Sequence, residues 1–442
     1  MTAVLTPPAP ATGGPSATRP CGCAEGERAS LLSRRRFLAS IGAAGAAGLV
    51  TSLDIAGTST QVAFAEPGYT GDTLVVLSLR GGFDGLSAVA PVGDPAYAAA
   101  RPSIAVPSSR ALPLDSMFGL HPALAPLMPF YRAGSLAVVH AVGQVSRTRS
   151  HFQAMEEMEN AAPGSSLRTG WIDRMVGLTS PRNDFAAVAL SSGEAPSSMR
   201  GPVPEVVMSD IDSFSLIAAD LPGEQERLAA AMRALYARAP AVLKAPALAT
   251  LAATRTTRTL ERAGYTPATG ATYPAGSLGT GLREIARLVK AGVGVRAATV
   301  DLGDWDMHVG LGRSDRGWMF DQLTVLGSAL AAFATDLGDR FADVTLVTMS
   351  EFGRRVGENG SGGLDHGHGN ACLVLGGGVV GGRVHGRWPG LAPADLDQGD
   401  LAGTTDIRTV LAEVVEKRSG VAAGGVFPDL GGDRLGIVRA RS

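Results

Sequence analysis

The amino-acid sequence predicts an α/β protein with a doubly wound, mainly parallel sheet and helices on both faces. The first observation is a series of short apolar runs, most of which end in polar or glycine-rich turns. The second is the set of amphipathic stretches with helical spacing that separate these runs. Strands of a parallel sheet are covered by helices on both faces, so they read as continuous apolar runs.

The expected strands and helices alternate along most of the chain. The apolar runs that predict strands are residues 73–79, 135–142, 184–190, 205–208, 293–300, 344–349 and 371–375. Helical patterns occupy residues 122–132, 282–290, 318–337 and 407–414 and the segments that begin near residues 152 and 169. Residues 222–281 are rich in alanine, arginine and leucine and have no strong strand pattern, so they predict a helical insertion over the sheet.

The N-terminal segment has the features of a Tat export signal. Arg34 and Arg35 form a twin-arginine pair ahead of a weakly hydrophobic Gly/Ala-rich stretch, and Ala65 ends a small-x-small sequence suited to cleavage. The apolar stretch is shorter than the roughly 20 strongly apolar residues that a membrane span needs. We expect the Tat translocase to export the chain to the periplasm or the cell exterior and residues 1–65 to be removed, with an uncleaved N-terminal anchor as the alternative.

The mature chain would begin at Glu66 and form a single domain over residues 66–442. Cys21 and Cys23 would leave with the signal, and the apolar neighbours of Cys372 indicate a small buried side chain rather than a nucleophile. The chain carries 39 basic and 41 acidic side chains, a formal charge of −2. This balance gives no electrostatic reason to expect nucleic acid or an anionic membrane as a partner. We expect no membrane span in the mature chain.

The first apolar run stops in a glycine-rich turn, RGGFDGL at residues 80–86. A strand that ends in such a turn is the usual entry to a helix in an α/β domain. The glycines allow backbone N–H groups to approach a ligand closely, and Arg80 could pair with an oxyanion. The alternative is a structural turn with a surface ion pair.

A second loop, residues 143–152, combines hydroxyl and basic side chains just before a helical pattern. Thr148, Ser150 and His151 belong to it. Such residues at a helix N-terminus suit an anion, because the free N–H groups and the helix dipole both favour negative charge. The alternative is that Ser150 is a helix N-cap, and both roles are compatible.

The loop after residues 344–349 carries the densest set of potential metal ligands or acid/base groups, Glu351, Asp365, His366 and His368. A second acid-rich loop, after residues 293–300, contains Asp304, Asp306 and His308. Carboxylate and imidazole ligands suit zinc, manganese or iron, and open α/β sheets place such groups at the ends of strands. The alternative is a set of loop histidines that bond to backbone carbonyls.

Four segments resemble a family of secreted bacterial proteins, often Tat-exported, that is named only as domain-of-unknown-function family 1501. They are residues 80–86, 149–152 (RSHF), 350–354 (SEFGR) and 363–378, which include an Asp-His pair and a triple glycine. The resemblance covers nearly the whole mature chain. The family is grouped with the alkaline phosphatase/sulfatase superfamily. The resemblance therefore implies a doubly wound fold, metal ions and a Ser, Thr or modified Cys nucleophile that acts on phosphate or sulfate esters.

The resemblance implies site residues as well. Asp304 and His308 match an Asp-x-x-x-His metal pair, and His366 or His368 stands where a later histidine completes that metal site.

The second metal site of the superfamily is matched less well. The superfamily has an Asp-His pair where this chain has Glu351-Phe352, and phenylalanine cannot bind a metal. Glu351 can still bind one. The superfamily also has an aspartate at the end of the first strand, for which Asp84 is the nearest match.

These observations lead to two functional hypotheses. The first is an exported hydrolase of phosphate or sulfate esters that uses a divalent zinc, manganese, iron or calcium ion. In this hypothesis the hydroxyl of Ser150 or Thr148 attacks the ester. Arg80 and Arg354 neutralise the negative charge that develops on the ester group. The second is a non-catalytic exported protein that binds an anion or a metal with the same fold, which the phenylalanine at a ligand position favours.

Overall fold

The computed structural model describes residues 71–216 and 223–441. Arg34, Arg35 and Ala65, on which the expected export signal depends, lie outside the described residues. Within the described ranges, no helix combines the length and the apolar character that a membrane span requires.

A mostly parallel sheet forms the centre of the described chain. Its strands are β1 (Thr73–Leu79), β5 (Leu136–Gly143), β6 (Ala187–Leu190), β7 (Val206–Met208), β8 (Ala297–Leu302), β9 (Val344–Met349), β10 (Asn370–Gly376), β11 (Val384–His385) and β12 (Thr405–Asp406). Their order is β11-β5-β10-β9-β1-β8-β6-β7, with β12 also paired to β5. β9, β1, β8, β6 and β7 are parallel to their neighbours in this run, whereas β10 is antiparallel to both β9 and β5.

A second, small sheet contains β2 (Val89–Ala90), β4 (Gly119–Leu120) and β3 (Leu112–Pro113) in that order. The helices of the described chain are α2 (Gly85–Ala88), α3 (Pro95–Ala100), α4 (Met128–Arg132), α5 (His151–Asn160), α6 (Trp171–Leu178), α7 (Glu224–Tyr236), α8 (Ala241–Ala263), α9 (Ser277–Ala291), α10 (Trp318–Leu337) and α11 (Ile407–Ser419). Short 3-10 helices occupy Pro122–Leu127, Ser197–Met199, Gly338–Asp343 and Ala423–Gly425.

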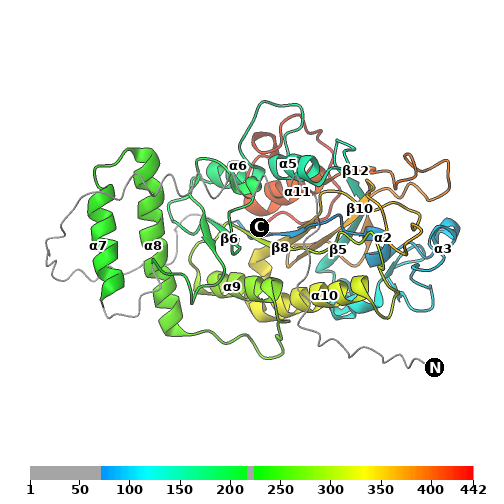
Figure 1. Cartoon of the computed structure of the whole chain (residues 1–442), viewed down its shortest axis with the longest axis horizontal. Helices are drawn as coiled ribbons and strands as arrows, with labels where there is room; N and C mark the ends of the chain where they lie inside the picture. The colour runs from blue at the N-terminus through cyan, green and yellow to red at the C-terminus, as the bar shows by residue number, and fades with distance from the viewer. Residues whose placement is uncertain (1–70, 217–222, 442) are drawn as a thin grey trace, which may run out of the picture. The chain divides into compact units, whose positions relative to one another are not determined.

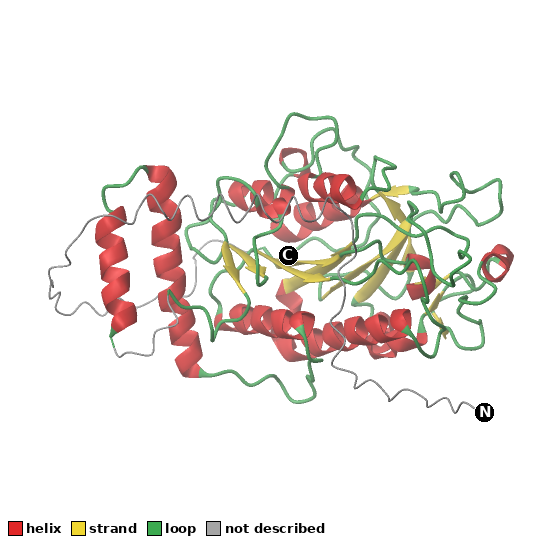
Figure 2. Ribbon diagram, viewed as in Figure 1, coloured by secondary structure: helices red, strands yellow, loops and turns green. Residues whose placement is uncertain are grey.

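Helices cover both faces of the large sheet. α9 and α10 lie on one face, and α5, α6 and α11 lie on the other (Figures 1 and 2). All of β1 is buried, and its side chains alternate between two hydrophobic cores. Val75 and Leu77 pack in the core that includes α9 and α10, whereas Leu74 and Val76 pack in the core that includes α6 and α11. Burial on both faces explains the continuous apolar run in the sequence.

The predicted α/β class with a mostly parallel, helix-covered sheet is confirmed. The helical segment expected at residues 222–281 contains α7, α8 and the first residues of α9, which begins at Ser277 rather than at residue 282. α7 and α8 pack side by side as a hairpin, and α8 also contacts β7.

Candidate metal site

Four connections meet at one edge of the large sheet. β1, β8 and β9 run in the same direction, so the loops that follow them leave from the same edge. β10 runs antiparallel to β9, so the connection between these strands leaves the sheet and returns to it at that edge. β5 is also antiparallel to β10, so its end carries α5 to the same place. In open α/β sheets this carboxyl edge is where ligands bind.

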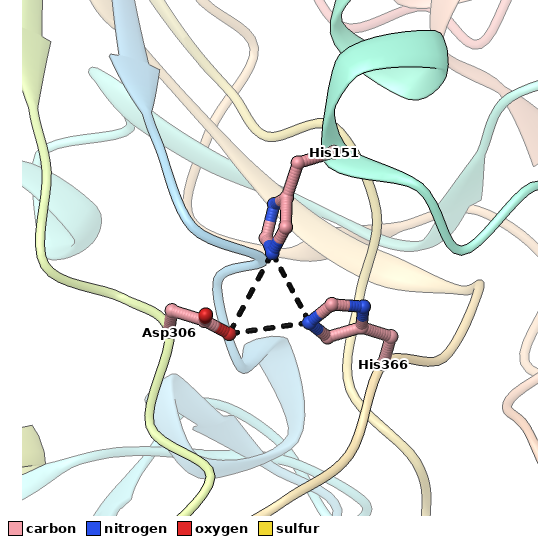
Figure 3. A group of neighbouring side chains, drawn as sticks. All are labelled: His151, Asp306 and His366. Atoms are coloured by element: carbon pink, nitrogen blue, oxygen red, sulfur yellow. Dashed lines mark hydrogen bonds and ion pairs between the residues drawn. The ribbon is translucent and has the colours of Figure 1, made fainter. Parts of the chain in front are cut away.

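Three side chains from three of these connections face one another (Figure 3). His151 is the first residue of α5, Asp306 follows β8, and His366 precedes β10. Nε2 of His151 lies 3.1 Å from Nε2 of His366. Oδ1 of Asp306 lies 3.2 Å from Nε2 of His366 and 3.6 Å from Nε2 of His151. Two imidazole nitrogens and a carboxylate oxygen, all within 4.8 Å of one another, form a group that can hold a metal ion.

A third imidazole approaches the same carboxylate oxygen. Nε2 of His308 lies 3.0 Å from Oδ1 of Asp306 and 2.9 Å from Nε2 of His366. Oδ1 of Asp306 therefore has three imidazole nitrogens around it. We call His151, Asp306, His308 and His366 the histidine cluster.

Each imidazole of the cluster also forms a hydrogen bond through its other nitrogen, Nδ1, to an acceptor outside the cluster. The partners of Nδ1 are the Glu351 carboxylate for His151 (2.8 Å), the Arg149 carbonyl oxygen for His366 (2.8 Å) and the Asp365 carboxylate for His308 (3.3 Å). Carbonyl oxygens and ionised carboxylates only accept hydrogen bonds, so each Nδ1 carries a proton and donates it. In a neutral ring this leaves the lone pair of Nε2 directed into the cluster, which is the usual arrangement of a metal-binding histidine.

The electrostatics of the cluster favour a positive charge. Hydrogen bonds to Asp306 and then to Glu351 raise the pKa of His151 to about 9, although partial burial opposes this rise. Burial opposes ionisation of Asp306, but hydrogen bonds from His151, His366 and Arg354 hold its pKa far below the ordinary value. The carboxylates that stabilise a proton on His151 would equally stabilise a metal cation.

Arg354 orients the central carboxylate. Its side chain is 1% exposed, and its guanidinium donates to Oδ1 of Asp306 over 2.7 Å. The same guanidinium donates to the carbonyl oxygens of Gly82 and Leu364, over 2.6 and 2.9 Å. Arg354 thereby ties the turn after β1 to the two loops that carry cluster residues.

Phe352 closes the cluster on one side. Its ring centroid lies 4.8 Å from that of His151 and 4.6 Å from that of His366. Gly82, at a φ of +71°, allows this packing, because a Cβ atom there would lie 2.6 Å from the Phe352 ring. The phenylalanine at the expected ligand position thus packs against two cluster histidines.

The structure brings several of the expected metal ligands together. His308 and His366 belong to the cluster, and Glu351 contacts it through His151. Asp304 does not belong to it, although it is only two residues from Asp306. Its backbone has a φ of +65°, and its carboxylate makes no hydrogen bond or ion pair within residues 71–216 and 223–441.

The two other expected ligands have partners elsewhere. Nε2 of His368 lies 3.0 Å from the carbonyl oxygen of Gln144, and its ring is buried. Asp84 is buried and accepts two hydrogen bonds from the fully buried Arg101, of 2.6 and 2.9 Å.

Two of the other expected catalytic residues, Arg80 and Thr148, bond to groups outside the cluster. Arg80 pairs with Asp301 at 2.6 Å and with Glu159 at 2.8 Å. The hydroxyl of Thr148 donates to Gln153 over 2.8 Å. Ser150 is the N-cap residue of α5, but its side chain makes no capping hydrogen bond.

Sequence reasoning placed two cluster residues in the right loops but did not select them as metal ligands. Asp306 was passed over because the Asp-x-x-x-His spacing pointed to Asp304. His151 was assigned only to an anion-binding loop. The signal that was available for His151 is its place at the end of an apolar run, the same position that marked the loops after β8 and β9.

Comparison with known proteins gives a family but no curated relative. Residues 133–413, more than half of the chain, match a family described as "Protein of unknown function (DUF1501)". All four residues of the histidine cluster, together with Glu351, lie within the matched range. No curated protein matches the sequence. The match over most of the sheet and the whole cluster places the chain in the DUF1501 family.

Proposed function

We propose that this protein is an exported, metal-dependent hydrolase of phosphate or sulfate esters. His151, His366 and Asp306 would hold one transition-metal ion, and His308 lies beside them against the Asp306 carboxylate. The observation that carries the proposal is the orientation of the three imidazoles, each with Nδ1 on an acceptor and Nε2 directed at the Asp306 carboxylate. Metal-binding histidines have this arrangement, because the acceptor fixes the tautomer and the ring orientation.

The spacing of the donor atoms supports the same proposal. Nε2 of His366 lies 3.1 Å from Nε2 of His151 and 2.9 Å from Nε2 of His308. When all three rings carry their proton on Nδ1, these inward lone pairs repel one another unless a cation lies between them. Metal–nitrogen bonds of about 2.1 Å place neighbouring ligand atoms roughly 3.0 to 3.4 Å apart.

The donor set favours some metals over others. Two imidazole nitrogens and one carboxylate oxygen suit zinc, iron or manganese. Calcium prefers six to eight oxygen ligands, so of the expected metals it fits this cluster least.

The chemistry follows from the surroundings of the cluster. A divalent metal held there would act as a Lewis acid and lower the pKa of a bound water toward neutrality. The N-terminus of α5, which begins with His151, would favour an anionic substrate group beside the cluster. Ser150 and Thr148 shortly precede His151 in the sequence and are the candidate nucleophiles. Arg354 is buried on Asp306, so it would orient a ligand rather than contact substrate.

Three further parts of the proposal rest on the sequence. The twin-arginine segment supports export to the periplasm or the cell exterior by the Tat translocase. The resemblance to the alkaline phosphatase/sulfatase superfamily supports the finer fold assignment. It also supports small phosphate or sulfate esters as substrates.

The second candidate function is non-catalytic binding of a metal or an anion. The packing of Phe352 on two cluster histidines favours it, because this residue stands where the superfamily has a second metal ligand. A protein with one such site could bind a metal or an anionic group without hydrolysing an ester.

The test is ester hydrolysis by the metal-loaded protein. We expect release of nitrophenol from p-nitrophenyl phosphate or p-nitrophenyl sulfate, and its loss in the Asp306→Ala/His366→Ala double variant. The control is His385→Gln, since His385 bonds to the Val380 carbonyl oxygen away from the cluster. Equal hydrolysis by the double variant would refute the hydrolase proposal. A bound metal with no hydrolysis of either ester would favour the non-catalytic function.

A further inference from the structure

The chain as a whole is nearly neutral, but one segment of it is strongly basic. Between residues 227 and 260 the sequence has no aspartate or glutamate. The same segment carries six basic side chains: Arg227, Arg233, Arg238, Lys244, Arg255 and Arg258. The rest of the chain therefore has an excess of acidic residues. The segment forms most of α7 and α8, the helical hairpin (Figure 1).

Apolar side chains are exposed where the two helices of the hairpin meet. Leu235 is 68% exposed near the end of α7, and Leu243 is 55% exposed near the start of α8. The four residues between the helices, 237–240, include the exposed Arg238 and Pro240. No residue of α7 is fully buried. We call residues 233–244 the hairpin tip.

The basic side chains of the tip are available to a partner. Arg233, Arg238 and Lys244 make no ion pair or hydrogen bond through their side chains within the described part of the chain. Near the opposite end of the hairpin, by contrast, Arg258 pairs with Glu226 at 2.6 Å. Three of the basic side chains of the hairpin that have no such partner therefore lie at the tip, beside the exposed leucines.

We propose that the hairpin tip binds the surface of an anionic lipid membrane. Exposed leucines flanked by lysine and arginine are the pattern of interfacial segments, in which the apolar groups enter the lipid and the cations contact the headgroups. Proteins that bind single-stranded nucleic acid add aromatic side chains that stack on bases. The exposed large apolar side chains described at the tip are Leu235 and Leu243, and its one aromatic side chain, Tyr236, is half-buried. This inference is independent of the metal cluster and of the proposed hydrolysis.

The first test is sedimentation of the exported protein with vesicles of phosphatidylglycerol and phosphatidylcholine. We expect binding to vesicles rich in phosphatidylglycerol, weak binding to pure phosphatidylcholine, and release at high salt. Each basic residue near an anionic surface changes affinity by about fivefold, so Arg233→Gln/Arg238→Gln/Lys244→Gln should weaken binding roughly 100-fold. The matched control, Arg132→Gln/Arg200→Gln, removes exposed cations elsewhere and should bind like the parent.

A second measurement locates the contact and is independent of any lipid binding by the N-terminal segment. In a Cys21→Ser/Cys23→Ser background, an environment-sensitive dye on Ala241→Cys should shift to the blue when phosphatidylglycerol vesicles are added. Cys372 is 2% exposed and should stay unlabelled. The proposal is refuted if the dye does not shift. It is also refuted if the dye responds to a single-stranded oligonucleotide but not to vesicles, or if the triple variant binds vesicles as tightly as the parent.

Discussion

Replacement of Glu351 by glutamine isolates the contribution of the carboxylate behind His151. The Glu351 side chain is 1% exposed, and its Oε1 accepts hydrogen bonds of 2.8 Å from Nδ1 of His151 and from the backbone N–H of Gly81. Burial opposes its ionisation, but these hydrogen bonds hold the pKa of Glu351 below its ordinary value. Glutamine keeps an acceptor oxygen for both donors, removes the negative charge, and replaces the oxygen that accepts from the Ser350 hydroxyl with an NH2 group.

The expected result is weaker metal binding in a folded protein. Loss of a carboxylate that holds a metal-binding histidine lowers metal affinity by about 10- to 100-fold, or roughly 1.4 to 2.7 kcal/mol. The assay is competition for zinc with a chromogenic chelator, alongside thermal unfolding of the metal-free protein. Glu358→Gln is the matched control, because its carboxylate bonds to the N–H groups of Ser103 and Ile104 instead. Equal zinc affinity for Glu351→Gln and its parent would refute the proposed role of this carboxylate.

Three further predictions concern pH, loop anchoring and a buried ion pair. Burial lowers the pKa of His140 to about 4 despite its hydrogen bond to the Val89 carbonyl oxygen. Below about pH 6.5 this side chain therefore binds a proton in the unfolded chain that it does not bind in the folded one. The free energy of unfolding should therefore increase by ~3 kcal/mol over the full range between these two pKa values, of which about 2 kcal/mol falls between pH 5 and pH 7. Urea unfolding at pH 5 and pH 7 measures this, and an undiminished slope in His140→Gln would contradict it. The Asn359 side chain donates to the His308 carbonyl oxygen over 2.9 Å, so Asn359→Ala should lower zinc affinity by about tenfold, and an unchanged affinity would contradict this anchoring. Arg101→Met leaves the buried Asp84 without its partner and should cost ~3 to 5 kcal/mol in urea unfolding, whereas a loss below ~1 kcal/mol would contradict the pairing.

The sheet could be predicted from the sequence because its strands are buried on both faces. The run at residues 73–79, for example, is buried over its whole length and contributes to both cores. The antiparallel direction of β10 could not be predicted, since it depends on pairing with β5 and β9. That pairing brings the end of β5, and with it His151, to the edge where the loops after β8 and β9 meet.

The loops of the site could be predicted, but not every residue that points into it. His308 and His366 were expected from their positions after apolar runs, and their Nε2 atoms lie 2.9 Å apart. The choice between Asp304 and Asp306 depends on the path of a loop, and the positive φ of Asp304 has no signal in the residue spacing. The hairpin tip was missed for another reason, because the total charge of the chain averages over a basic segment and an acidic remainder.

The metal content of the purified protein is the most direct test of the histidine cluster. It should be measured by mass spectrometry on the folded protein, beside the His366→Ala variant, since Nε2 of His366 contacts the other three cluster residues. The proposed site predicts about one transition-metal ion per chain in the parent and its loss in the variant. The absence of metal from a parent grown with added zinc, iron and manganese, or the same metal content in the variant, would contradict it.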